Sequence, residues 1–265
     1  MRLWERKPDG ELVLREFADR DVPAYAILSH TWLEYNHKEV SFQDVEAGTG
    51  KSKPGWQKIE FCADKAAAHG LSYFWIDTCC IDKRNAVELS TAINSMFGWY
   101  QNAARCYVYL SDVSMPNTKQ HDSSAWESAF KMSRWFTRGW TLQELIAPKL
   151  VDFYSLEGER IGSKLTLELL IHEITGIART ALGGAALSSL SINERMSWTQ
   201  QRNTTLEEDK AYCLLGIFNV SMPPIYGEGK ESAFRRLQHE IHISHKGGQY
   251  RRNHLPIDMA DLSRC

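Results

Sequence analysis

The chain has 265 residues, of which 43% are hydrophobic and 24% charged, and its 31 basic side chains nearly balance 33 acidic ones. This composition supports a buried core, excludes wholesale disorder and lacks the basic excess of a dedicated nucleic-acid-binding protein, although a local basic patch stays open. No apolar run approaches the roughly 18 residues of a membrane-spanning helix, and the first residues lack a signal peptide's apolar segment. We therefore expect no nucleic-acid or membrane partner and a reducing compartment, the cytoplasm or alternatively the nucleus.

Strand and helix patterns alternate along the first two thirds of the chain. Continuous apolar runs suit strands buried on both faces, and apolar spacings of three and four residues suit helices. The predicted strands lie at 24–28, 71–76, 106–110 and 150–154. The predicted helices lie at 55–69, from 86 to about 100, 127–134, 141–147 and 165–174, and a polar loop occupies 33–54. The alternation predicts an α/β fold, a doubly wound, mostly parallel sheet of about four or five strands with flanking helices.

The sequence also predicts how the chain divides. We expect an N-terminal extension at 1–23, the α/β core at 24–175, an additional helical region packed on that core at 176–245, and a disordered tail at 246–265. Within the helical region, Thr205 and Glu208 fit a capping box that starts one helix. An amphipathic pattern predicts another helix at 230–243.

Polar side chains follow each predicted parallel strand. The pairs are Ser29 with His30, Asp77 with Thr78, and Ser111 with Asp112, and Ser155 follows the last strand. Ligands of open parallel sheets bind outside the carboxyl ends of the strands, so these side chains are expected to gather at one edge. The alternative is that they only cap the helices that follow.

The segment Arg134–Leu145 carries the densest set of aromatic and polar residues. On a helix, Trp140 and Glu144 share a face, so an indole and a carboxylate could hold a flat cationic ring and a sugar hydroxyl. The alternative is local: Thr141 caps the helix and Glu144 reciprocates as its third residue.

Other candidate groups are weaker. His30 has no second His at ligand spacing and could be structural, and a thiol pair with Cys79 or Cys80 lacks an orienting group. Lys83 and Arg84 open a helix, which suits a phosphate or a solvated turn. Neither nucleotide-binding glycine motif is present, and the cysteine spacing does not fit a metal site, so we expect no metal.

Three blocks of sequence resemble the hallmark segments of the fungal heterokaryon incompatibility (HET) domain. They are YAILSHTW at 25–32, FWIDTCCID at 74–82 and RGWTLQEL at 138–145. Segments 195–198, 208–218 and 222–229 are also similar to that family. The resemblance covers about residues 20–243 and consists of several long blocks in the same order.

The resemblance implies a fold and a reaction. HET domains are distantly similar to TIR domains, which implies a TIR-like, flavodoxin-like sheet. In TIR domains that cleave NAD, a Glu in the corresponding last helix is catalytic, and here it is Glu144. By this resemblance NAD is a substrate rather than a cofactor, cleaved to nicotinamide and ADP-ribose. Ser29, His30 and Asp77 would line the ribose, Trp32 or Trp140 would stack a ring, and Lys83 and Arg84 would face the pyrophosphate.

The resemblance also implies partners. The family acts in programmed cell death after incompatible fungal cells fuse, so partner incompatibility proteins and attached NTPase or repeat domains are expected. TIR-like sites are often completed between subunits, which implies a homo-oligomer. The alternative function is a non-enzymatic module that signals by self-association, with Glu144 only a cap. A nuclease is a weaker alternative, because no paired acidic metal-binding motif is seen.

Overall fold

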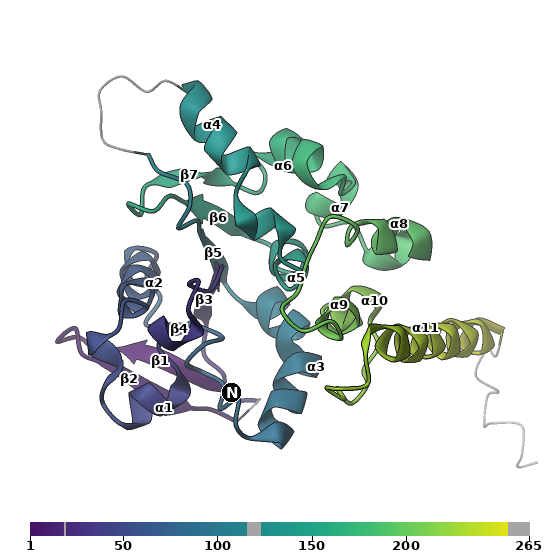
Figure 1. The fold of residues 1–265 in the computed structure, drawn as a ribbon, viewed down its shortest axis with the longest axis horizontal. Helices are drawn as coiled ribbons and strands as arrows, with labels where there is room; N and C mark the ends of the chain where they lie inside the picture. Colours follow the sequence, from purple (N-terminus) through teal and green to yellow (C-terminus); the bar gives the residue numbers. More distant parts are fainter. Residues whose placement is uncertain (19, 116–122, 254–265) are drawn as a thin grey trace, which may run out of the picture.

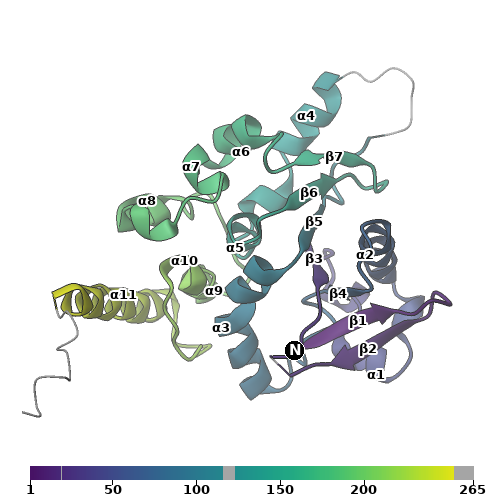
Figure 2. The same cartoon turned by 180° about the vertical axis from the view of Figure 1, so that it is seen from behind.

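The computed structural model describes residues 1–18, 20–115 and 123–253 (Figures 1 and 2). Its centre is a seven-stranded sheet in the order β2-β1-β4-β3-β5-β6-β7. The strands are β1 Arg2–Arg6, β2 Leu12–Glu16, β3 Tyr25–His30, β4 Tyr73–Trp75, β5 Arg105–Tyr109, β6 Val151–Tyr154 and β7 Arg160–Ser163. The predicted α/β class is thus confirmed, with a mixed sheet that has more strands than expected.

The middle of the sheet is parallel. β4, β3, β5 and β6 lie side by side and run in the same direction, whereas β1, β2 and β7 pair antiparallel. In chain order these four central strands are arranged second, first, third, fourth, as in flavodoxin-like sheets, where ligands bind at the reversal between first and third. Here that reversal lies between β3 and β5. All six residues of β3 are buried, as expected for a strand covered on both faces.

The N-terminal residues are part of the sheet. The stretch 1–23, expected to be an extension, supplies the hairpin β1–β2, and β1 pairs with β4. Trp4 is buried and stacks on Phe74 with ring centroids 6.3 Å apart. Gly10 in the turn has a φ of 87°, a left-handed conformation that glycine adopts without strain. The hairpin therefore covers what would otherwise be an exposed edge of the parallel strands.

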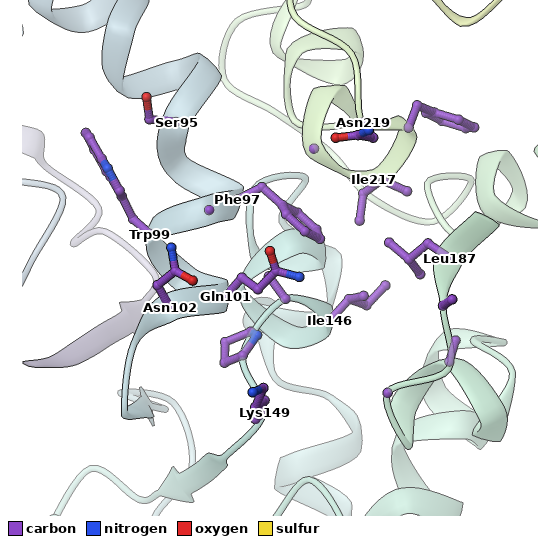
Figure 3. Close-up of a pocket in the computed structure, with 18 of the residues that line it drawn as sticks. Ser95, Phe97, Trp99, Gln101, Asn102, Ile146, Lys149, Leu187, Ile217 and Asn219 are labelled. Carbon is purple, nitrogen blue, oxygen red and sulfur yellow. The ribbon is translucent and has the colours of Figure 1, made fainter. Parts of the chain in front are cut away.

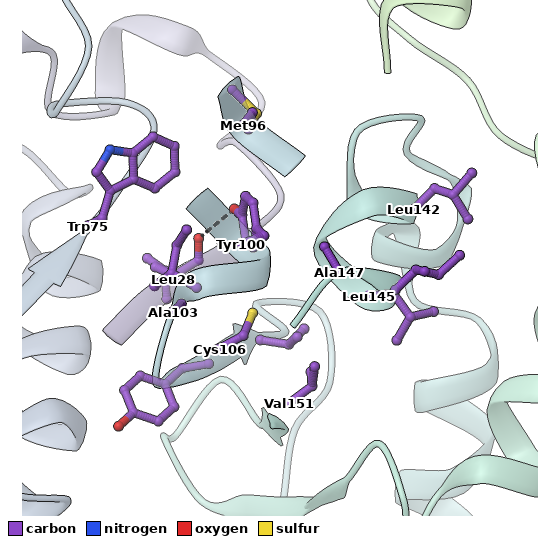
Figure 4. Packing of buried hydrophobic residues seen from close by; sticks show 14 of the residues in the cluster. Leu28, Trp75, Met96, Tyr100, Ala103, Cys106, Leu142, Leu145, Ala147 and Val151 are labelled. Atoms are coloured by element: carbon purple, nitrogen blue, oxygen red, sulfur yellow. Dashed lines mark hydrogen bonds between the residues drawn. The ribbon is translucent and has the colours of Figure 1, made fainter. Parts of the chain in front are cut away.

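Helices cover both faces of the sheet. α2 (Trp56–Ala68) packs on β3, β4 and β5 from one side, and α5 (Thr141–Ile146) packs on β3 and on α3 (Ala86–Asn102) from the other (Figures 1 and 2). The Tyr100 hydroxyl of α3 donates to the Leu28 carbonyl of β3 at 2.9 Å, inside the buried cluster that Figure 4 shows. Leu28, Trp75, Met96 and Leu145 belong to that cluster, so helix and sheet share one core.

The segment 33–54 is more ordered than a loop. It contains η1 (Asn36–Lys38), α1 (Phe42–Glu46) and η2 (Gly50–Ser52). Ser41 and Asp44 form a capping box at the start of α1, because each side chain bonds to the other's backbone N–H. The sequence prediction of an unstructured loop missed this box.

Short helices lie between and after the last strands. They are α4 (Ser123–Lys131), η3 (Arg134–Thr137), α6 (Glu168–Thr175), α7 (Arg179–Leu182), η4 (Leu187–Ser189), α8 (Ile192–Ser197), α9 (Asp209–Tyr212) and α10 (Leu215–Phe218). Among them η3 and α7 pack on α5, and α10 packs on α3. The predicted capping box at Thr205 is wrong: Glu208 itself is the N-cap of α9, and its carboxylate accepts from the backbone of Gly227 and Gly229.

The last helix is longer than predicted. α11 (Lys230–Asn253) packs against α9 and continues ten residues beyond Ile243, into the stretch expected to be a tail. The rest of that predicted tail, 254–265, lies outside the described residues.

Candidate active site at the carboxyl edge of the sheet

The end of β3 places functional side chains on both faces of the sheet. Successive residues of a strand point to opposite faces, so Ser29 and His30 face different helices. Ser29 meets α5 and η3, and His30 meets α2. The two clusters that result lie at the carboxyl end of β3, next to the reversal of strand order.

The first cluster joins Ser29 to Glu144. The Ser29 hydroxyl donates to the Glu144 carboxyl and accepts from the Trp135 indole N–H at 2.8 Å. Ser29 and Trp135 are 0% exposed and Glu144 is 8% exposed. This hydrogen bond joins residues 115 positions apart in the sequence, and it bears on whether Glu144 caps its own helix.

Glu144 does not cap its own helix. The N-cap of α5 is Trp140, without a side-chain capping bond, and the Thr141 hydroxyl donates to the Trp135 carbonyl at 2.6 Å. The predicted local pairing of Thr141 with Glu144 is therefore wrong, because tertiary contacts satisfy both side chains instead. The Glu144 carboxyl therefore has no capping role in α5 and accepts from Ser29 instead.

The surroundings of Glu144 favour its neutral form. Burial raises the pKa of Glu144 to about 8, and the negative charge of Asp77 acts in the same direction. The hydrogen bond from Ser29 and the positive charge of Arg202 oppose this rise. At neutral pH the Glu144 carboxyl beside Ser29 is thus mostly protonated, and a nearby cation would favour its ionised form.

Arg202 is a charged neighbour of Glu144 that was not among the residues predicted from the sequence. Its guanidinium is 3% exposed and donates through Nη1 to the Arg138 carbonyl and the Thr141 hydroxyl, both at 2.8 Å. Its Nη2 has no acceptor among the described residues. In the sequence, Arg202 is marked only by its position shortly after segment 195–198, which resembles the HET family. That position alone does not identify a site residue.

The second cluster is centred on Asp77. One of its oxygens accepts from His30 Nε2 at 3.1 Å, and the other accepts from Trp32 Nε1 at 3.0 Å and Lys83 Nζ at 3.3 Å. The Lys83 ammonium also lies 3.9 Å from the centroid of the Trp32 ring. Burial acts to raise the pKa of Asp77, but Lys83 and His30 outweigh it and hold that pKa well below its ordinary value.

A buried ion pair fixes the orientation of His30. The Lys58 ammonium donates to His30 Nδ1 and to the Thr31 carbonyl, both at 3.0 Å, and to the Glu39 carboxylate. Since Lys58 is a donor at Nδ1, the His30 proton sits on Nε2 and points at Asp77. Lys58 was missed in the sequence, although it falls on the apolar face of α2, which was the available signal.

Two predicted residues lie elsewhere. Arg84 is two-thirds exposed and pairs with Asp82 and Glu46 rather than with Asp77. The Trp140 indole donates to Asp209 at 3.0 Å and so ties α5 to α9. Of the eight predicted site residues, the remaining six are brought together at the edge: Ser29, His30, Trp32, Asp77, Lys83 and Glu144.

The cysteines near the edge are core residues. The Cys79 sulfur accepts from the Trp4 indole at 3.2 Å, and burial raises the pKa of the Cys80 thiol well above its ordinary value. Neither thiol suits a nucleophile. Within residues 1–18, 20–115 and 123–253, no cluster of three His, Cys, Asp or Glu side chains could hold a metal ion. No helix in the same ranges is long and apolar enough to cross a bilayer.

The strand order and these clusters define an α/β domain with a polar, partly buried cluster of side chains at the carboxyl edge of a mixed, mostly parallel sheet. The family profile described as "Heterokaryon incompatibility protein (HET)" matches residues 25–128, from β3 to α4. The chain is 53% identical over 242 residues to "Vegetative incompatibility protein HET-E-1" of Podospora anserina, covering 91% of this chain and 18% of that protein. No solved structure matches the chain. The chain belongs to the heterokaryon incompatibility (HET) domain family, and it spans less than a fifth of that relative.

Proposed function

We propose that this chain is the HET domain of a fungal allorecognition and cell-death protein, and that it cleaves NAD to nicotinamide and ADP-ribose. The proposal rests mainly on Glu144. Ser29 holds its carboxyl group at the carboxyl edge of the sheet, and this carboxyl does not cap its own helix. The name of the similar Podospora protein supports the part in vegetative incompatibility. The TIR-like resemblance supports the reaction.

Cleavage of NAD requires few catalytic groups. The C–N bond between ribose and nicotinamide breaks, its electron pair leaves with the neutral nicotinamide, and water adds to the ribose carbon and releases a proton. No general acid is needed, because the leaving ring is already cationic in NAD. One carboxylate can stabilise the positive charge that develops on the ribose. Glu144 is ionised for this step, and the cationic substrate favours that form because opposite charges attract in a buried site.

The Asp77 cluster would hold the rest of the dinucleotide. Lys83 is about one-third exposed and lies over the Trp32 ring. A pyrophosphate would draw the Lys83 ammonium toward itself and leave the ring face open for a base to stack. His30, fixed by Lys58, uses its N–H to hold the Asp77 carboxylate in place.

The test is nicotinamide release from NAD by the purified chain and by Glu144→Gln. Gln keeps the size and an acceptor for Ser29, but it cannot carry a negative charge. The expected loss is about 10²–10³-fold in rate, the usual value of one electrostatic contact to a transition state. Glu127→Gln is the control and should keep its activity, because Glu127 is a partly exposed residue of α4 that pairs with Lys131. An active Glu144→Gln protein would contradict the assignment.

Self-association without catalysis is the second candidate, and the burial of Glu144 favours it. A carboxyl that is 8% exposed offers little surface to a substrate in the closed site. The two functions separate in cells: Glu144→Gln should abolish cell death if NAD cleavage is the signal, and should leave it intact if assembly is the signal.

A further inference from the structure

A large cavity lies at the opposite edge of the sheet, where the parallel strands begin. It is a cleft that opens to solvent, has a volume of about 1410 Å³ and is lined by α3, the α5–β6 connection, the segment from α7 to η4, and α10 (Figure 3). Tyr25 and Lys149, at or next to the starts of β3 and β6, line it. None of the eight residues predicted for the carboxyl edge lines this cavity, so it is a separate site.

The charged side chains that line the cavity are all basic. They are Lys149, Lys164 and Arg195, and among the described residues no Asp or Glu side chain lines it. Arg195 is 4% exposed, and its guanidinium lies 4.6 Å from the Phe218 ring centroid. Its Nη1 donates to the Ile217 carbonyl at 3.0 Å, and its Nε has no acceptor in the described part of the chain. This buried cation therefore has an unused donor.

Lys164 adds a second buried cation. It is 6% exposed, and its ammonium donates to the carbonyls of Leu145 and Pro148 at 3.1 and 2.7 Å. Those are neutral acceptors, and burial lowers the pKa of Lys164 to about 8. Buried charges are ordinarily balanced by an opposite charge, because leaving water is costly for an ion. An anion in the cavity would supply that balance for both side chains.

The rest of the lining suits an organic molecule with a flat ring. Figure 3 shows Phe97 and Gln101 from α3, Ile146 after Glu144 on α5, and Leu187 and Ile217 from the other wall, all directed toward a common space. Apolar and aromatic walls with a few amides are typical of small-molecule sites. The volume is ample for a molecule of nucleotide size.

A glycine in the middle of α3 lies on the wall of this cavity. Gly98 lines the cavity, and a methyl group at its Cα would meet no heavy atom of the described residues within 4 Å. Glycine inside a helix costs about 0.5–1 kcal/mol relative to alanine. Neither a turn nor a close packing contact explains this glycine, and a bulky side chain at this position would project from the cavity wall.

We propose that this cavity binds an organic phosphate of nucleotide size, with its phosphates on Arg195 and Lys164 and its ring against Phe97. The site is independent of the proposed NAD cleavage, because it uses different residues at the opposite edge of the sheet.

Calorimetric titration of the purified chain with ATP tests the site, with adenosine and inorganic pyrophosphate as the two halves of the probe. ATP should bind, and each half should bind at least about tenfold more weakly. Arg195→Gln should weaken ATP binding by about tenfold or more, the usual worth of a hydrogen bond to a charged group. Gly98→Trp should abolish binding by filling the space, whereas Gly98→Ala should change Kd by less than about threefold, since a methyl meets no atom there.

Lys149→Glu reverses an exposed charge at the cavity and should also weaken binding, whereas Lys230→Glu, the same change on exposed α11, should not. If Arg195→Gln does not fold, ATP binding by Gly98→Trp and by Lys149→Glu still tests the proposal. Glu144→Gln should bind ATP normally, which separates this site from the proposed active site. The proposal is overturned if ATP does not bind at millimolar concentration, if adenosine binds as tightly as ATP, or if Gly98→Trp binds like the unchanged protein.

Discussion

Glu144→Gln should change how the stability of the fold depends on pH. The pKa of Glu144 is about 8 in the folded protein, against an ordinary value of 4.5. Between these values the unfolded chain loses the Glu144 proton while the folded chain keeps it. The folded state then binds more protons, so the free energy of unfolding falls as pH rises from 4.5 to 8. Gln cannot ionise, so this contribution is absent in the variant.

The expected magnitude follows from the same two pKa values. Each pKa unit corresponds to about 1.4 kcal/mol, so the change from 4.5 to about 8 corresponds to about 5 kcal/mol. Near pH 5 most of this stabilisation is present, and the two proteins should differ by about 1 kcal/mol or less. Above pH 8 the carboxylate is ionised in a buried site, and Glu144→Gln should be the more stable protein by up to that amount.

Urea unfolding of both proteins from about pH 5 to about pH 9 measures this difference directly. Other groups titrate in the same range, for instance Asp209, whose pKa burial raises, so the quantity of interest is the gap between the two proteins. Glu127→Gln controls for loss of an exposed charge. A gap that stays constant with pH, or a variant that is less stable above pH 8, would show that Glu144 is ionised in the fold and would refute this reasoning.

Three further outcomes are expected. The kcat/KM for NAD should rise with pH to a plateau above about 8, because the ionised form of Glu144 carries the charge, and a flat profile would contradict this. Lys58→Met should cost about 3–5 kcal/mol in urea unfolding by leaving Glu39 buried and unpaired, and adding Glu39→Gln should restore part of it. Gly216→Ala should cost at least about 1–3 kcal/mol, because its Cβ would lie 2.1 Å from Phe97, whereas Gly98→Ala should raise the melting temperature.

The parallel centre of the sheet was predictable because each strand is an apolar run that ends in polar residues. The carboxyl ends of parallel strands share an edge, so the meeting of His30 and Asp77 followed from the pattern alone. The hairpin β1–β2 was not predictable in the same way. Its strands have five residues each and mix charged with apolar side chains, and only the pairing with β4 shows which face is buried.

Contacts distant in sequence explain the other differences. The pattern from Thr141 to Glu144 fits a capping box, yet Thr141 bonds to Trp135 and Glu144 to Ser29, because the packed fold offers both side chains buried partners. Lys58 was overlooked since its partner Glu39 lies 19 residues away in the segment predicted to be a loop. Local patterns cannot distinguish a cap from a tertiary hydrogen bond.

NAD cleavage and self-association are compatible functions, because the burial of Glu144 accounts both for its low exposure and for its neutral form. A carboxyl with a pKa of about 8 is ionised in roughly one tenth of molecules at pH 7. A contact with a second copy that opened the edge to water would lower that pKa toward 4.5 and ionise nearly all of them. Assembly could then raise NAD cleavage about tenfold through ionisation alone. Nicotinamide release measured across a dilution series at pH 7 and above pH 8 tests this link. The gain on concentration should be largest at pH 7 and nearly absent above pH 8, and an equal gain at both would mean that assembly does not act through the Glu144 proton.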